Sequence, residues 1–286
     1  MIIDRSNLNT SEDITQITQE NAVIAPLPKG INNITNSSIT IGSIQPEHNN
    51  KQIIIGSPHE DKVYVLSHEI WNRDNGFIDE ESMDEYIDSD SFKRPSIPDD
   101  INNSQDSIEF GSSVKILNLT IDDKQQNTLI IAARSGAKHQ ELESTYDNEL
   151  NSLFGGSTYI YQNIKDSAKI DDHGVAIPTH IIHGVTDRIP FKKNDLPVPD
   201  SEGDLYPEGH GFGENLGFSI TSLNLDQDDS DDLVLGSPDF AIDSTNESGR
   251  VVVLFGRKLW HTDLENTSQP NIIKLDKSIE VNDGLS

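Results

Sequence analysis

The sequence contains no cysteine among its 286 residues. This absence excludes a disulfide framework, a thiolate metal site and a cysteine nucleophile. It leaves secretion open, because extracellular proteins also hold metal ions with oxygen ligands, without sulfur. Long apolar runs are also missing, so we expect no membrane-spanning helix. The start, Met1 to Arg5, lacks a basic segment followed by an apolar one, so no signal peptide is visible.

Positive charge is scarce in this chain. There are 21 Lys and Arg residues against 49 Asp and Glu, which gives a formal net charge of -28. Such a charge repels phosphate backbones and anionic lipid surfaces, so we expect no nucleic-acid partner and no membrane insertion. The hydrophobic content of 33% is low for one dense core and favours a β-rich body with many loops.

What the chain does contain is a series of short runs rich in Ile, Val, Leu and Tyr, separated by Gly, Pro, Asn and Asp. These runs predict an all-β fold. Three stretches superpose, at 39–66, 110–161 and 213–256. In each, about 16 to 19 residues separate the first strand from a corner, a constancy that indicates a repeat. The corners are Ser57-Pro58, Ala133-Arg134 and Ser237-Pro238.

Each repeat is expected to carry a fourth strand. The candidates are Ser107–Phe110, Thr179–His183 and Asn271–Leu275, and the last two follow a proline, which edge strands tolerate. The segments 68–106, 136–152 and 164–209 are expected as insertions that leave the repeats as loops. Residues 1–30, rich in Asn, Thr and Gln, are expected as an irregular lead-in, with a strand possible at 22–27.

The third stretch resembles the FG-GAP repeat of integrin α chains and of many secreted proteins. The residues that carry the resemblance are Leu216–Ile220, Asp231–Pro238 and Gly249–Gly256. The resemblance covers residues 31–286 and implies a β-propeller of four-stranded blades, here a partial one with blades at 31–110, 111–205 and 206–286. Three blades cannot close a ring of four to eight. We therefore expect the remaining blades to come from a longer chain or from another chain.

An acidic loop lies between the first two strands of the third repeat. Its alternate residues offer oxygen atoms to one centre, as a calcium cage requires. They are Asn224, Asp226, Asp228, Ser230 through its main-chain carbonyl, and Asp232. The loop resembles the calcium loop of the family, with Asn224 in place of an Asp and Asp229 in place of the Gly that takes a left-handed turn. We expect Asp229 to adopt that turn.

Two other interpretations of the loop stay open. An EF-hand requires Gly at position six and Glu at position twelve, where this chain has Asp229 and Leu235. The loop is otherwise an acidic turn that binds nothing. The corresponding loops at 45–51 and 120–126 have few carboxylates and a lysine each, so one calcium ion is expected and not three.

The resemblance implies a non-catalytic, calcium-stabilised binding or adhesion module that acts outside the cell or at its surface. A protein or glycan partner would lie on the rim of the propeller, where loops of successive blades gather. The alternative is an accessory or loop-built catalytic part of a secreted hydrolase, phospholipase-like or glycosidase-like. His180 and His183 would point to opposite faces of a strand, so they are poor joint ligands.

Overall fold

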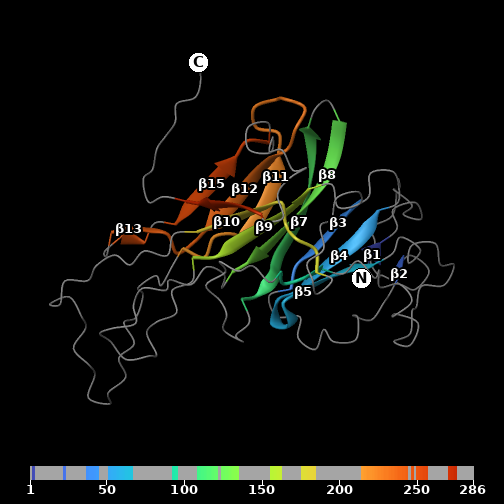
Figure 1. Ribbon diagram of the computed structural model, residues 1–286, viewed down its shortest axis with the longest axis horizontal. Coiled ribbons are helices and arrows are strands. Elements are labelled where there is room, and N and C mark those ends of the chain that lie inside the picture. Colours follow the sequence, from blue (N-terminus) through green and yellow to red (C-terminus); the bar gives the residue numbers. More distant parts are fainter. Residues whose placement is uncertain are drawn as a thin grey trace, which may run out of the picture.

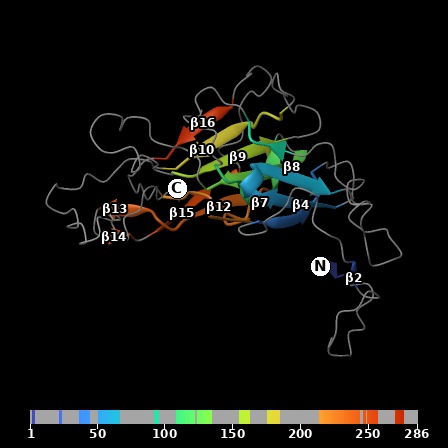
Figure 2. The same ribbon diagram turned by 90° about the horizontal axis from the view of Figure 1, so that it is seen from below.

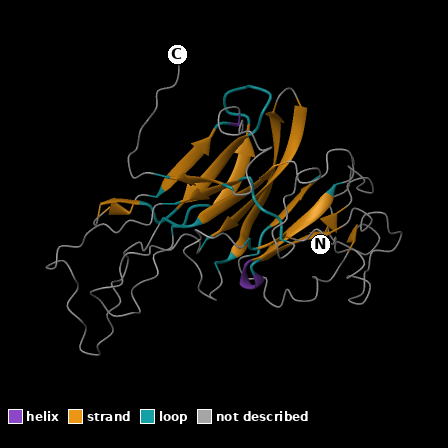
Figure 3. Cartoon of the chain, viewed as in Figure 1, coloured by secondary structure: helices purple, strands orange, loops and turns teal. Residues whose placement is uncertain are grey.

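The computed structural model describes thirteen segments of the chain: 2–3, 22–23, 37–44, 51–66, 92–95, 108–121, 124–134, 155–162, 175–184, 214–243, 246–247, 249–256 and 270–275. The described part is all-β, as predicted, and its strands are joined by turns and by the 3-10 helix η2 (Pro58–Glu60) (Figure 3). None of its helices is long and apolar enough to cross a membrane. Most of the expected insertions and of the lead-in lie outside the described residues.

Three sheets form the body of the described part, and we call them the first, second and third sheet in chain order (Figure 1). The first sheet contains β3 (Ile39–Gly42), β4 (Gln52–Ser57), β5 (Lys62–Leu66) and β6 (Phe92–Lys93). The second contains β7 (Phe110–Ile121), β8 (Lys124–Ala133), β9 (Ser157–Gln162), β10 (His180–His183) and β16 (Asn271–Lys274). The third contains β11 (Ser219–Leu223), β12 (Asp232–Ser237) and β15 (Arg250–Leu254).

Two short ladders lie outside these sheets. β1 (Ile2–Ile3) pairs with β2 (Ala22–Val23), and β13 (Ala241–Asp243) pairs with β14 (Asn246–Glu247).

The three main sheets confirm the predicted first, second and third strands of all three repeats. Each repeat is an antiparallel meander, in which neighbouring strands along the chain pair with each other. No sheet formed by the described residues closes on itself.

The second sheet lies between the other two, and both of its faces are buried. Alternate residues of a strand point to opposite faces, so β8 sends Ile131 into a core shared with the first sheet and Ile130 into a core shared with the third. Ile54 and Val65 fill the first core from the first sheet, and Leu235 fills the second core from the third sheet. A strand buried on both sides needs no polar face, which is why residues 129–133 of β8 form an uninterrupted apolar run.

The opening segment of each later sheet packs tightly on the sheet before it. Gly111 has a φ of 95°, and a Cβ there would lie 2.9 Å from the carbonyl oxygen of Lys62 on β5. Gly217 has a φ of 84°, and a Cβ there would lie 2.8 Å from the Cβ of Ala132 on β8. Both positions require glycine for its left-handed backbone and for the close approach. A closely packed glycine with a left-handed backbone is therefore found where the first sheet meets the second and where the second meets the third.

Two of the expected fourth strands are wrong. Phe110 begins β7, and the fourth strand of the first sheet is β6. Asn271–Lys274 is a strand, but it pairs in parallel with β10 at the edge of the second sheet and not with β15 (Figure 2). β16 covers the outer edge of β10, and Ile273 and Leu275 pack against the core between the second and third sheets. Only the strand at 179–183 occupies its predicted place, as β10.

Candidate metal site

The acidic loop is tied together by its last predicted ligand, Asp232, at the start of β12. This side chain is wholly buried. Its Oδ2 accepts a hydrogen bond from the backbone N–H of Leu225 at 2.6 Å, and its Oδ1 accepts one from the N–H of Gly256 at 3.0 Å. Asp232 therefore connects the start of the loop to the end of β15. Hydrogen bonds to a charged group are stronger than neutral ones, which suits a buried carboxylate.

The other predicted ligands shape the loop itself. The Oδ1 of Asp226 accepts a hydrogen bond from the N–H of Asp228 at 3.4 Å, and the Oδ1 of Asp228 accepts one from the N–H of Ser230 at 2.7 Å. The side-chain amide of Asn224 donates to the carbonyl oxygen of Asp228. The two Asp bonds, from a side chain to the backbone two residues on, are typical of tight turns.

The expected left-handed turn at Asp229 is wrong. Gln227 is the loop residue with a positive φ, at 61°. The turn lies two residues earlier, whereas Asp229 is held by the neighbouring sheet: the hydroxyl of Thr120 on β7 donates to its carbonyl oxygen at 2.7 Å. The resemblance placed the turn where the family has glycine, whereas contact with β7 determines it in this chain.

The loop lies against β7 of the second sheet over several residues. The N–H of Asn118 donates to Oδ2 of Asp231 at 2.9 Å, and the N–H of Asp231 donates to the carbonyl oxygen of Asn118 at 2.9 Å. The N–H of Thr120 donates to the hydroxyl of Ser230, also at 2.9 Å. Sequence reasoning missed Asn118 and Thr120, because they precede Ser230 by more than 100 residues along the chain and carry no local signal. The loop thus joins the second and third sheets.

The donor set of the loop fits calcium chemically. Five of the seven residues at 226–232 are Asp, and a divalent cation would relieve their mutual repulsion. Each carboxylate oxygen has two lone pairs, so one hydrogen bond leaves room for a metal. Within the described residues, however, no three carboxylate or imidazole side chains converge to hold a metal ion. A calcium ion would therefore have to draw Asp226 and Asp228 inward, with Asp232 as the fixed end of the cage.

The two histidines of β10 have separate surroundings, as their spacing predicts. Nδ1 of His183 lies 2.8 Å from the hydroxyl of Ser157, and Nδ1 of His180 lies 3.0 Å from the hydroxyl of Thr179. Ser157 is wholly buried, so its hydroxyl is shielded from any substrate. We assign the Ser157 and His183 pair to packing between β9 and β10.

Burial lowers the pKa of His180 from 6.5 to about 4. The folded protein therefore keeps this imidazole neutral at pH values where the unfolded chain binds a proton. Stability rises with pH wherever the unfolded state binds more protons, so we expect it to fall as the pH drops from 6.5 towards 4. In His180→Gln that part of the loss should be missing. Urea unfolding of both proteins at pH 7.5, 6 and 5 measures it, and parallel pH curves would contradict the assignment.

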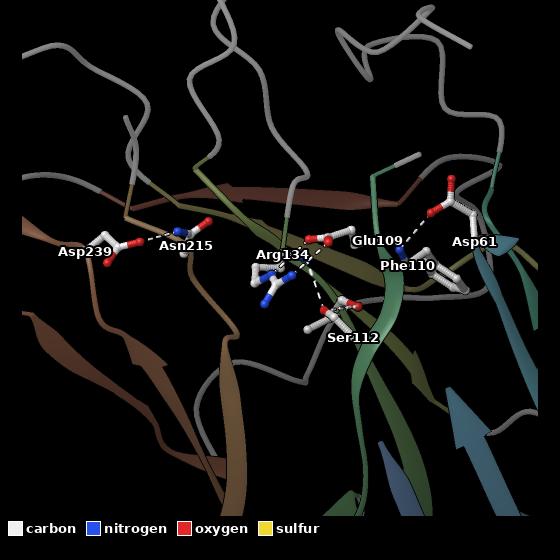
Figure 4. A network of polar contacts seen from close by, with 8 residues as sticks. Asp61, Glu109, Phe110, Ser112, Arg134, Asn215 and Asp239 are labelled. Atoms are coloured by element: carbon white, nitrogen blue, oxygen red, sulfur yellow. Dashed lines mark hydrogen bonds and ion pairs between the residues drawn. The ribbon is translucent and has the colours of Figure 1, made fainter. Parts of the chain in front are cut away.

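A row of polar contacts lines the ends of the strands where the sheets meet (Figure 4). The carboxylate of Asp61 accepts hydrogen bonds from the N–H groups of Phe110 at 2.9 Å and Ile108 at 3.2 Å, so the first sheet holds the start of β7. Glu109 pairs with Arg134 through two bonds of 2.8 and 2.7 Å. These contacts position the opening segment and offer no converging donors for a ligand.

A deeper ion pair lies at the start of the third sheet. Glu214 is buried and accepts two hydrogen bonds of 2.6 Å from the guanidinium of Arg250, the first residue of β15. The guanidinium carbon also lies 4.2 Å from the centre of the Phe240 ring. Arg250 was predicted only as part of a strand, and its acidic partner is 36 residues away in sequence.

Comparison of the chain with protein-family models and with curated proteins gave no match.

Proposed function

We propose that this chain is a non-catalytic, calcium-stabilised binding module of the FG-GAP type, in which the three sheets are blades of a larger β-propeller. The observation that carries the proposal is the position of the acidic loop. It belongs to the third sheet and is hydrogen-bonded to β7 of the second. A cation held by Asp226, Asp228 and Asp232 would therefore stabilise the junction between two sheets as well as the loop itself.

The repeated packing supports the blade assignment. Two successive junctions use a glycine with a left-handed backbone, Gly111 and Gly217, at the same place in the opening segment. Further sheets, from a longer chain or another chain, would continue the series. Loops of successive blades would then share one rim, where a protein or glycan partner binds. Calcium sites of millimolar affinity are filled outside cells, so we place the module there or at the cell surface.

Calcium titration tests the loop. At a free calcium concentration of about 100 times the dissociation constant, binding to the folded state adds about 2.7 kcal/mol. For a chain of this size we expect a rise in melting temperature of roughly 5 to 10 °C. Asp228→Asn should abolish most of the rise, because it removes a ligand at the centre of the donor set. Differential scanning calorimetry with calcium and with chelator measures the shift.

The matched control is Asp229→Asn. It removes the same charge from the same loop, but Asp229 is exposed and its fixed contact is through its carbonyl oxygen. A calcium response that survives in Asp229→Asn and is lost in Asp228→Asn supports a cage with the predicted alternate ligands. If calcium leaves the melting temperature of the unchanged protein where it was, the metal part of the proposal is wrong.

A further inference from the structure

The register of the ladders makes positions in the three sheets equivalent. Residues of β5, β9 and β15 are equivalent when their cross-strand partners in the second strand of each sheet are equivalent. By this rule the third strands have matching positions at Val65, Ile160 and Val253. By the same rule Ile39 of β3 matches Val114 of β7, each opposite an isoleucine of the second strand. Each sheet thus has a forward face, turned to the next sheet in the series, and a backward face, turned to the one before.

The forward face of the third sheet is exposed, although its equivalents are buried. Val65 and Ile160 lie in the two cores, whereas Val253 is 37% exposed. Val251 is 67% exposed, and its equivalents Val63 and Thr158 are wholly buried. Leu223 on β11 is 43% exposed, although its equivalent Leu117 on β7 is also wholly buried. We call Leu223, Val251 and Val253 the forward row.

The backward face of the first sheet is exposed along its first strand alone, because on β4 and β5 the residues of that face are 2 to 5% exposed, namely Ile53, Ile55, Tyr64 and Leu66. Ile39 is 63% exposed and Ile41 is 50% exposed. Their equivalents on β7, Val114 and Ile116, pack into the core between the first and second sheets. In that junction β7 is the strand that contacts β3, β4 and β5. Ile39 and Ile41, the backward row, therefore lie on the strand that would make the same contact with a preceding sheet.

Each first strand has an equivalent serine near its start, and the first two of these serines donate hydrogen bonds to the next sheet. The hydroxyl of Ser38 donates to the carbonyl oxygen of Gly111 at 3.3 Å, and that of Ser113 donates to the carbonyl oxygen of Phe218 at 3.1 Å. Ser219 is the equivalent residue of β11, since it lies opposite Gly236 as Ser113 lies opposite Ala132. Within the described segments no carbonyl group of another sheet receives its hydroxyl.

We propose that the forward row of one chain binds the backward row of a second copy, so that the copies associate head to tail. The chain exposes the forward row of a junction that it already builds twice internally, and on β3 it exposes the first-strand residues of the opposite half. A contact between two different patches of the same protein closes a ring or continues as a filament, according to its rotation. The inference rests on the part of the proposed function in which further sheets complete the series, and it does not depend on calcium.

Charge sets the conditions under which the contact forms. Each copy has a formal net charge of -28, so two copies repel each other. The Debye length is about 10 Å at 0.1 M salt and about 3 Å at 1 M. The contact itself is apolar and is not weakened by screening. Association should therefore become stronger as salt is added, in contrast to an interface built on ion pairs.

Sedimentation velocity of the unchanged protein, in chelator, at 0.05 and 1 M sodium chloride tests this. We expect monomer at low salt and a concentration-dependent larger species at high salt. Val251→Asp and Ile39→Asp should each abolish the larger species. Ile272→Asp is the matched control, because it places the same charge on an exposed apolar residue of β16 outside both rows. Circular dichroism confirms that each variant is folded.

Mixing the two variants tests whether the contact joins the forward row of one copy to the backward row of another. Val251→Asp retains an intact backward row, and Ile39→Asp retains an intact forward row, so an equimolar mixture should restore a dimer that neither forms alone. If the protein stays monomeric at every salt and protein concentration, or if Ile39→Asp associates as the unchanged protein does, the head-to-tail contact is wrong. These outcomes leave the calcium response untouched, so failure here is distinguishable from failure of the metal proposal.

Discussion

Replacing Gly56 by alanine is expected to lower the free energy of unfolding by about 3 kcal/mol or more, at the upper end of what overpacking of a close contact costs. Gly56 lies on β4, where a Cβ would overlap the carbonyl oxygen of Gly111 and would lie 3.1 Å from the hydroxyl of Ser38. The backbone of Gly111 in turn lies close to β4 and β5, since a Cβ on Gly111 would lie 2.9 Å from the carbonyl oxygen of Lys62 and 3.1 Å from the backbone nitrogen of Ser57. The first and second sheets would have to separate to accept one methyl group.

The matched control is Gly236→Ala, at the equivalent position of β12 in the third sheet. The three atoms nearest to a Cβ there all belong to Ser219, whose hydroxyl can rotate away. We expect a change of no more than about 1 kcal/mol, since surface substitutions without such contacts are usually small. Urea unfolding at neutral pH measures both variants. Equal losses in the two would show that the close packing of Gly56 on Gly111 is not what requires glycine.

Replacing Glu214 by alanine should cost about 3 to 5 kcal/mol, the usual price of removing one partner from a buried ion pair. The Glu214 side chain is 2% exposed and that of Arg250 is 15% exposed, so the guanidinium would keep little water to replace the lost carboxylate. Glu214→Gln should cost less, because the amide oxygen still accepts one hydrogen bond. Chemical denaturation followed by fluorescence measures the series.

Glu109→Ala is the matched control for this pair. Glu109 also makes a two-bond contact with Arg134, at 2.8 and 2.7 Å, but both side chains are almost a quarter exposed. Water can replace the lost partner, so we expect a loss of about 1 kcal/mol. A Glu214→Ala variant with the same small loss would mean that burial of the Arg250 pair adds nothing to its strength. The double variant Glu214→Ala with Arg250→Ala would then show the coupling directly.

Most strands could be predicted from the sequence because their signal is local. Runs such as Ile53–Ile55, bounded by turn residues, specify a buried strand whatever lies beside it. The likeness of strands and corners among the three repeats also predicted how first, second and third strands pair within each sheet. Hairpin partners are close in sequence, so their pairing follows from order along the chain.

The donor residues of the acidic loop could be predicted from the sequence, but its conformation could not. The alternate oxygen side chains from Asn224 to Asp232 could be read directly, and their chemistry suits calcium. The turn at Gln227 and the docking on Asn118 and Thr120 could not, because they depend on which strand of another sheet lies beside the loop. The calcium ion itself stays a prediction.

By itself, the sequence determined an all-β chain, the positions of its repeated strands, its strong negative charge and a cluster of oxygen donors in one loop. The tertiary structure alone decided that β16 joins β10, that Glu214 buries its charge against Arg250, and that an apolar row is left exposed on each outer sheet. The division has a physical reason. Strand propensity and turn chemistry act between near neighbours, whereas edge pairing, ion-pair burial and sheet stacking depend on residues that only the folded chain brings together.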